Sequence, residues 1–165
     1  MNRVFLLESL KVRMEADTRE LIMPTKPQKG DEEVIERPAE VWNGRLPDMK
    51  STTKKAPYII NAVLTSRFRQ PPGREPESFV AVRSVYCVYN SDEHEGALML
   101  LNLMDRVRIS LQKNPILDGK YELNMEDDGI ADFVYPDDTA PFYLGEMLTE
   151  WKMPPVEREV QQWLF

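Results

Sequence analysis

The sequence is poor in the residues that form covalent or metal-stapled scaffolds. Its 165 residues include one cysteine, Cys87, and one histidine, His94. A single cysteine cannot close an internal disulfide, which excludes a disulfide-stabilised secreted scaffold, and one histidine excludes a multi-histidine metal site within one subunit. We expect Cys87 to be a small buried hydrophobic residue and His94 to lie at the surface, in the first turn of a helix.

Motifs for nucleotide binding and hydrolysis are also missing. The seven glycines never fall in the spacing of a dinucleotide-binding or phosphate-binding loop, and no G-x-S-x-G motif occurs. No apolar run approaches the roughly 18 residues that cross a bilayer, and the run at residues 4–7 is too short for a signal-peptide core. We therefore predict a soluble protein that is not an enzyme and uses no cofactor, metal or membrane.

Charge is the most informative feature that is present. The chain has 28 acidic and 21 basic residues, a formal net charge of −7, so tight DNA binding is not expected. Residues 45–74 carry seven bases and one acid, whereas residues 118–150 carry ten acids and one base. These segments could be independently solvated, could complement each other within the fold, or could pair head to tail between subunits.

The hydrophobic pattern predicts one domain over residues 1–165 with two helices. A chain of this length can bury a core without staples. The first helix is expected over residues 3–21, stopped by Pro24. The second is expected over residues 92–113, capped by Ser91 or Asp92. Its apolar stripe consists of Ala97, Leu100, Leu101, Met104, Val107 and Leu111.

Alternating apolar residues predict the strands of an α+β fold, a mostly antiparallel sheet of four to five strands with both helices packed on it. The expected strands are residues 58–65, 79–89, 120–124, 131–135 and 142–151. A long hairpin loop is expected at residues 66–76. Both faces of the first two strands carry apolar groups, so we expect helices on one face and another cover, such as a second subunit, on the other.

Two further segments are expected to be irregular. Residues 24–55 read as a long connection in which an apolar island, residues 41–47, docks on the core. Residues 155–165 read as a short helix or a free arm.

Acidic and aromatic side chains are the candidate functional groups. The acidic cluster consists of Glu126, Asp127, Asp128, Asp132, Asp137 and Asp138. It reads as a solvated loop, a charged contact surface or a divalent-metal site, although it lacks the spacing of a calcium loop. The aromatic residues Trp42, Tyr143 and Trp151 read as core or interface anchors.

The order of several short motifs resembles a known family over nearly the whole chain. The motifs are residues 21–25 (LIMPT), 41–47 (VWNGRLP), 56–60 (APYII), 85–92 (VYCVYNSD), 95–97 (EGA), 101–108 (LNLMDRVR), 141–147 (PFYLGEM) and 150–154 (EWKMP). This order resembles short proteins of tailed phages and prophages, and is similar to the tail terminator, or tail completion, proteins of long-tailed phages. Asp105 stands where a glutamate is common in that family, and the basic loop 66–76 is individual to this chain.

The resemblance implies a structural virion protein. Its subunits would form a homo-hexameric ring that caps the head-proximal end of the tail tube, stops tube polymerisation and joins the tail to the head connector. Its partners would be its own copies, the tail tube protein and a head-completion protein, with genome DNA passing through the ring without specific binding. Assembly would take place in the host cytoplasm, and the final location would be the neck of the virion.

We expect particular residues to serve that role. The interface candidates are Trp42, Arg45, Arg67, Arg69, Arg74, Trp151 and Trp163. The candidates for an acidic lumen or contact are Glu126, Asp127, Asp128, Asp137 and Asp138. The alternatives are a head-completion or stopper protein of the neck, a small metal-dependent hydrolase using Asp127, Asp128, Asp137 and Asp138, and a generic acidic adaptor.

Overall fold

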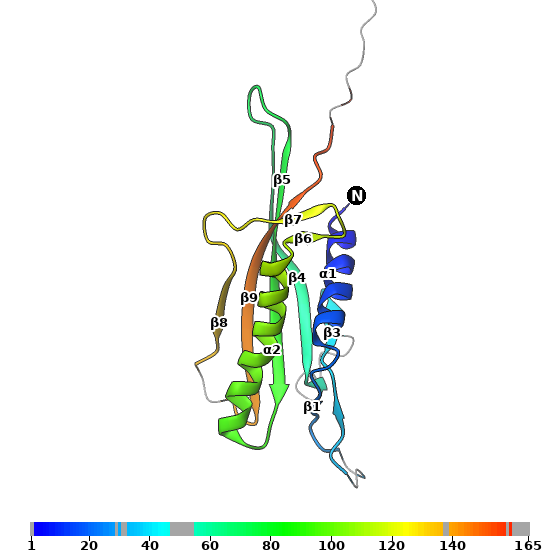
Figure 1. Ribbon diagram of the computed structural model, residues 1–165, viewed down its shortest axis with the longest axis vertical. Helices are drawn as coiled ribbons and strands as arrows, with labels where there is room; N and C mark the ends of the chain where they lie inside the picture. Colours follow the sequence, from blue (N-terminus) through cyan, green and yellow to red (C-terminus); the bar gives the residue numbers. More distant parts are fainter. Residues whose placement is uncertain are drawn as a thin grey trace, which may run out of the picture.

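The computed structural model describes residues 2–28, 30, 33–46, 55–136, 139–157 and 159, and these form an α+β fold. The elements in chain order are α1 (Arg3–Thr18), β1 (Met23–Pro24), β2 (Glu36–Arg37), β3 (Glu40–Asn43), β4 (Tyr58–Arg69), β5 (Glu77–Tyr89), α2 (Glu93–Lys113), β6 (Ile116–Leu117), β7 (Tyr121–Leu123), β8 (Ala131–Val134) and β9 (Phe142–Met153). Figure 1 shows a curled sheet with both helices in front of it. The predicted α+β class, with two helices and a mostly antiparallel sheet, is confirmed.

The long strands β4, β5 and β9 form the centre of the sheet. The strand order is β3-β4-β5-β9-β7-β6, and β8 pairs with β9 beside β7. Among the described strands, β3 and β4 are parallel and the other pairs are antiparallel. The described sheet therefore has seven strands, and β1 and β2 form a separate pair. The prediction of four to five strands was too low because β3 and β6 are too short to show an alternating pattern.

Helix α1 begins at the cap residue Asn2, whose side chain accepts a hydrogen bond from the Phe5 amide at 3.2 Å. It buries four residues at a strict spacing of four: Leu6, Leu10, Met14 and Thr18. The helix ends at Thr18 rather than at residue 21, because the chain then turns to bring Met23 into the core and to pair β1 with β2.

Helix α2 begins at Asp92, whose carboxylate accepts hydrogen bonds from the His94 and Glu95 amides. His94 is exposed in the first turn, as predicted. The buried face is rotated from the predicted stripe, because Ala97 and Leu101 are exposed and Leu103 is buried. The described core of this helix consists of Gly96, Leu100, Leu103, Met104, Val107 and Leu111.

Two glycines explain that rotation. A Cβ on Gly96 would lie 2.1 Å from the Tyr143 ring, and a Cβ on Gly145 would lie 2.7 Å from the Met104 sulfur. Because both glycines lack side chains, α2 approaches β9 closely on the side of Gly96 and Met104. Both belong to motifs that carried the resemblance, and their local role is helix–sheet packing.

The hairpin of β4 and β5 is longer than predicted and projects beyond the body of the molecule (Figure 1). Arg67 and Arg69 belong to β4 and pair with Phe79 and Glu77 of β5, so only residues 70–76 form the loop. The run of β-branched residues ends at Thr65, but cross-strand contacts extend the ladder to the end of β4. The predicted loop 66–76 was therefore too long.

The connection at residues 24–55 is more regular than predicted, because it contains β1, β2 and β3. Its apolar island docks on the core as expected, with Val41 and Leu46 buried. Residues 29, 31–32 and 47–54 of the connection lie outside the described residues. Residues 155–157 and 159 have no regular structure, and the remainder of the predicted arm lies outside the description. No helix of the described part is long and apolar enough to span a membrane.

Candidate interaction surface

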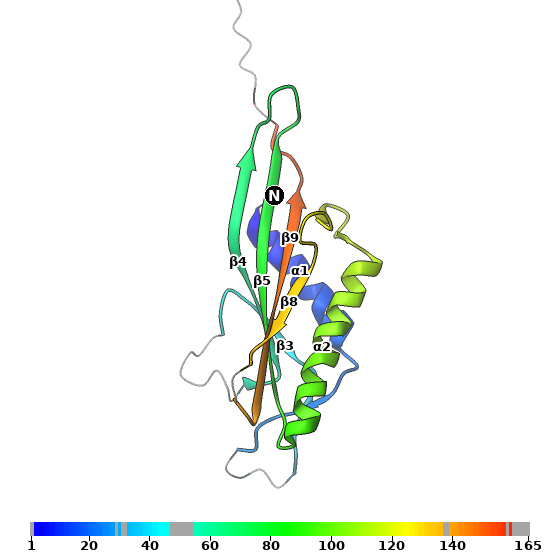
Figure 2. The ribbon, with the colours of Figure 1, turned by 90° about the vertical axis from the view of Figure 1, so that its left-hand side faces the viewer.

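The sheet has one face covered by helices and one face without them, which we call the open face (Figure 2). Strand register assigns side chains to each face, because directly opposite residues project from the same side. Val80 and Val82 of β5 point to the helices and are buried in the main core. The alternate residues of β5 form the open face: Phe79, Ala81, Arg83, Val85, Cys87 and Tyr89.

One end of the open face is covered by the chain that precedes β4. Leu46, Ala56, Tyr58 and Cys87 form a small buried cluster there. Cys87 is fully buried, as predicted, and burial raises the pKa of its thiol to about 12 although a hydrogen bond with Tyr58 lowers it. Beyond this cluster the open face has partly or fully exposed side chains: Ala62, Thr65, Arg67, Ala81, Arg83, Leu148, Glu150 and Lys152.

A charged cluster lies near the centre of the open face. One carboxylate oxygen of Glu146 on β9 accepts short hydrogen bonds from the Arg83 guanidinium on β5 and from the Tyr135 hydroxyl after β8. Glu146 is 7% exposed, whereas the Arg83 side chain is nearly half exposed. The Tyr135 ring stacks on Phe133, with ring centroids 5.7 Å apart.

The cluster keeps Glu146 ionised. Burial by itself raises the pKa of Glu146, but the hydrogen bonds from Tyr135 and Arg83 and the arginine charge outweigh it, so the pKa is lowered. The hydrogen bond to Glu146 raises the pKa of Arg83, and burial together with that carboxylate raises the pKa of Tyr135. Glu146 is therefore a fixed negative charge at neutral pH rather than a proton donor.

Sequence reasoning did not identify this cluster. Arg83 and Glu146 are 63 residues apart in the chain, and only the pairing of β5 with β9 brings them together. The single hint of this cluster in the sequence was Arg83, a charged residue among the apolar outward positions of β5.

The predicted basic residues lie mostly on the projecting hairpin. The Arg67 guanidinium is 3.5 Å from the Glu150 carboxylate and packs over the Phe79 ring at 5.0 Å. Arg69 pairs with Glu77 at 2.7 Å. Both arginine side chains remain more than half exposed. Arg74 lies exposed in the loop at the hairpin tip, and Arg45 lies exposed after β3.

The predicted acidic residues lie near the other border of the sheet. Glu126, Asp127 and Asp128 form an exposed turn between β7 and β8, which we call the acidic turn, and Asp132 is exposed on β8. None of these four carboxylates forms an ion pair with the described residues. No described group of three or more His, Cys, Asp or Glu residues is placed to hold a metal. Asp137 and Asp138 lie outside the described residues.

The two charged segments meet in part. The Arg67–Glu150 pair joins them directly, so some complementarity within the fold is confirmed. Arg67, Arg69, Glu126 and Asp127 also line one cleft of about 560 Å³. Glu146 of the acidic segment is buried against Arg83, whereas Glu126, Asp127, Asp128 and Asp132 are exposed.

The tryptophans have different environments. Trp151 on β9 is fully buried under the helices, and its indole N–H donates to the Thr149 hydroxyl at 2.9 Å. Its assignment as an interface candidate was wrong, because the side chain is fully buried within the chain, and its alternative reading as a core residue is confirmed. Trp42 on β3 is half buried, and its indole N–H donates to the Glu40 carboxylate at 3.2 Å. Trp163 lies outside the described residues.

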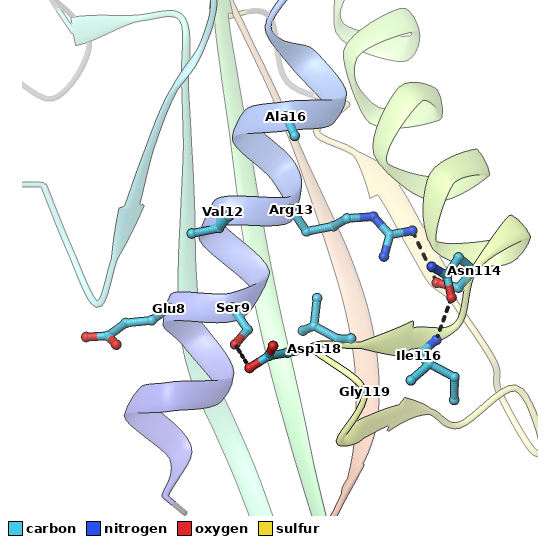
Figure 3. A pocket seen from close by; sticks show the side chains of 10 residues that line it. Glu8, Ser9, Val12, Arg13, Ala16, Asn114, Ile116, Asp118 and Gly119 are labelled. Carbon is cyan, nitrogen blue, oxygen red and sulfur yellow. Dashed lines mark hydrogen bonds between the residues drawn. The ribbon is translucent and has the colours of Figure 1, made fainter.

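A groove of about 740 Å³ lies on the helix side, between α1 and the turn after β6 (Figure 3). Ser9 donates to the Asp118 carboxylate at 3.4 Å, and Arg13 donates to the backbone carbonyl oxygens of Ser110 and Asn114. The Arg13 bonds tie α1 to the end of α2, and the Ser9 bond ties α1 to the turn after β6. Sequence reasoning identified none of them, because each contact joins α1 to residues about a hundred positions farther along the chain.

Neither a scan against protein-family models nor a search of curated proteins gives a match to this chain. The side chains of the open face therefore have to indicate what this surface binds. The open face combines apolar positions, exposed arginines and a fixed Arg83–Glu146 pair, and such a mixture of aromatic, aliphatic and arginine side chains is typical of protein–protein interfaces.

Proposed function

We propose that this chain is a ring-forming structural protein of long-tailed phages. In this role it is a tail terminator, which caps the head-proximal end of the tail tube, stops tube polymerisation and joins the tail to the head connector. The order of the sequence motifs supports the proposal. The observation that carries it is the open face of the sheet, which offers a large surface for a protein partner.

The composition of the open face favours contact with protein over contact with water. Antiparallel sheets that face solvent usually alternate apolar inward residues with polar outward residues. On β5, by contrast, the six outward residues from Phe79 to Tyr89 include one charged side chain, Arg83. Cys87 and Tyr89 are covered by the chain's own cluster, and Phe79, Ala81 and Val85 remain partly exposed as apolar positions that a partner could cover.

The charge distribution supports a ring through which DNA passes. Basic walls would retain phosphate, so a lumen suits acidic side chains. The acidic turn and Asp132 are exposed and without described ion pairs, which makes them the lumen candidates in this proposal.

Assembly is tested with the purified protein and tail tubes. Negative-stain electron microscopy and native mass spectrometry should show sixfold rings, free or at one end of each tube. Ala62→Glu, on the open face, should abolish the rings without unfolding the chain. Ala97→Glu, at an exposed position of α2, is the matched control and should leave them intact. Absence of rings in both the free and the tube-bound state would contradict the proposal.

The role in the virion is tested with an amber mutant of the gene. Loss of a terminator leaves filled heads and unattached tails, many of them overlong. Loss of a stopper protein instead lets the heads leak DNA. Leaking heads with tails of normal length would reject the terminator role in favour of the neck stopper.

A further inference from the structure

The sheet has two strand edges without a partner strand among the described residues. β3 pairs with β4 only at the beginning of β4, from Tyr58 to Asn61, so residues 62–69 of β4 have one unpaired edge. β8 pairs with β9 on one side, and no described strand lies on its other side. Unpaired edges expose backbone donors and acceptors, which can pair with a strand of another chain.

The strand directions allow these two edges to pair between copies. β4 is antiparallel to β5, β5 to β9, and β9 to β8. β8 therefore runs opposite to β4, and β4 of a second copy placed beside β8 would continue the antiparallel order. Because the two edges lie at opposite borders of one sheet, such a contact is head to tail, the kind that closes into a ring when the rotation between copies permits.

The charges favour this pairing over pairing of like edges. The chain has no acidic residue between Asp48 and Glu75, a segment that includes all of β4. It has no Lys, Arg or His between Lys120 and Lys152, a segment that includes the acidic turn and β8. Two β4 edges would bring arginines together and two β8 edges would bring carboxylates together, whereas β4 against β8 brings opposite charges together.

Both edges also carry large apolar side chains in water. Phe68 on β4 is 62% exposed and Phe133 on β8 is 47% exposed. Natural sheets usually protect their edges with charged or short strands, because exposed apolar edges aggregate. A neighbouring strand would cover these side chains.

We propose that residues 65–69 of β4 pair, antiparallel, with β8 of a second copy of this chain. The inference rests on the proposed function, because it identifies the self-contact of the proposed ring. The strand register also requires that neighbouring copies are displaced along the strand direction. Within one copy, Phe133 of β8 lies at the same level as Ile60 of β4, where β3 already occupies the edge. The neighbour pairs farther along β4, and closed sheets require a stagger of this kind.

Cysteine cross-linking tests the pairing. Arg67, Ala131 and Phe133 share the open face, whereas Asp132 projects from the helix side. We expect Arg67→Cys combined with Ala131→Cys or with Phe133→Cys to give, on mild oxidation, a ladder of covalent oligomers on non-reducing gels. The native Cys87 is buried and should not contribute. Arg67→Cys combined with Asp132→Cys is the matched control and should give no ladder.

The outcomes separate this inference from the proposed function. If the wild-type chain forms rings and neither same-face pair cross-links, the edge pairing is wrong and the ring function stands. If single-cysteine variants give dimers as efficiently as the double variants, like edges pair and the head-to-tail contact is wrong. If the wild-type chain forms no rings with or without tail tubes, both proposals fall.

Discussion

Glu146 joins three parts of the chain on the open face, because its carboxylate accepts hydrogen bonds from Arg83 on β5 and from Tyr135 after β8. Removing one member of such a cluster leaves buried polar atoms without a charged partner. The expected loss is about 1–2 kcal/mol of stability, at the low end of the range for hydrogen bonds to charged groups, because the Arg83 side chain is nearly half exposed.

The stabilisation by Glu146 should depend on pH. Its pKa in the folded chain lies below the ordinary value of 4.5, so the stabilisation is present above pH 4.5 and is lost as the pH falls through the folded pKa. Urea unfolding of wild type and Glu146→Gln between pH 7 and pH 3 should show a stability difference that shrinks in acid. Glu122→Gln, at an exposed position of β7, is the control and should have little effect. A difference that stays constant across this range would contradict the prediction.

Cys87 should be chemically inert in the folded protein. It is fully buried and burial raises its pKa to about 12, so the reactive thiolate is both rare and inaccessible. A coloured disulfide reagent at pH 8 should leave the native chain unmodified and should react with one thiol after unfolding in guanidinium. Ser91→Cys, at an exposed position before α2, should add one rapidly reacting thiol. Rapid reaction of Cys87 in the native wild type would show that the cluster around it opens.

The residue types in the sequence indicated which side chains are buried, but they did not indicate which side chains contact each other. Cys87 and His94 are where their chemistry predicted, because one is small and apolar and the other follows a helix cap. Arg83 and Glu146 could not be paired from the sequence, because their contact depends on the register of two strands 63 residues apart. The sequence allowed Trp151 to be a core residue or an interface residue. The structure places its side chain on the helix-covered face of β9, which makes it a core residue.

At the scale of elements, the close packing of α2 on β9 depends on Gly96. A side chain there would collide with the Tyr143 ring. Gly96→Leu should therefore destabilise the protein by about 1–3 kcal/mol, the usual range for overpacking, even though leucine favours the helix more than glycine does.

The control for this prediction is the adjacent residue. Ala97 is exposed on the same turn of α2, so Ala97→Leu should change stability by no more than about 0.5 kcal/mol. Thermal or urea unfolding of the two variants provides the measurement. Equal effects at both positions would show that the glycine contact does not position the helix.

Long elements were predicted and short ones were not. Helices α1 and α2 and strands β4, β5 and β9 have enough residues to show a period. β3 and β6 have four and two residues, and their place in the sheet is fixed by pairing with distant strands. The apolar outward positions of β5 correctly predicted a central strand, but the residues themselves do not identify what covers the open face.

At the scale of the whole molecule, β4 of the basic segment and β8 of the acidic segment have their free edges on opposite sides of the described sheet, and Arg67, Arg69, Glu126 and Asp127 line one cleft. The ion pair between Arg67 and Glu150 uses only one charge from each segment. Glu126, Asp127, Asp128 and Asp132 are exposed, and in the proposed ring each copy presents a basic edge to the acidic edge of its neighbour.

This arrangement predicts that two variants, each with one altered edge, will form a heterodimer with each other but no larger assembly. Variant one carries Arg67→Gly with Arg69→Gly, which removes the positive charge and lowers the strand propensity of this edge without adding negative charge, and keeps a functional β8 edge. Variant two carries Asp132→Lys with Phe133→Lys and keeps a functional β4 edge. Under conditions in which the wild type assembles, each variant alone should stay monomeric by cross-linking and native mass spectrometry.

An equal mixture of the two variants should give a heterodimer, because one functional β4 edge meets one functional β8 edge. The heterodimer should grow no further, since its two remaining edges are both altered. If like edges paired instead, variant two alone would dimerise through β4 and the mixture would add no new species. The mass of the mixed species thus distinguishes a head-to-tail contact, which can build a ring, from a symmetric contact, which stops at a dimer.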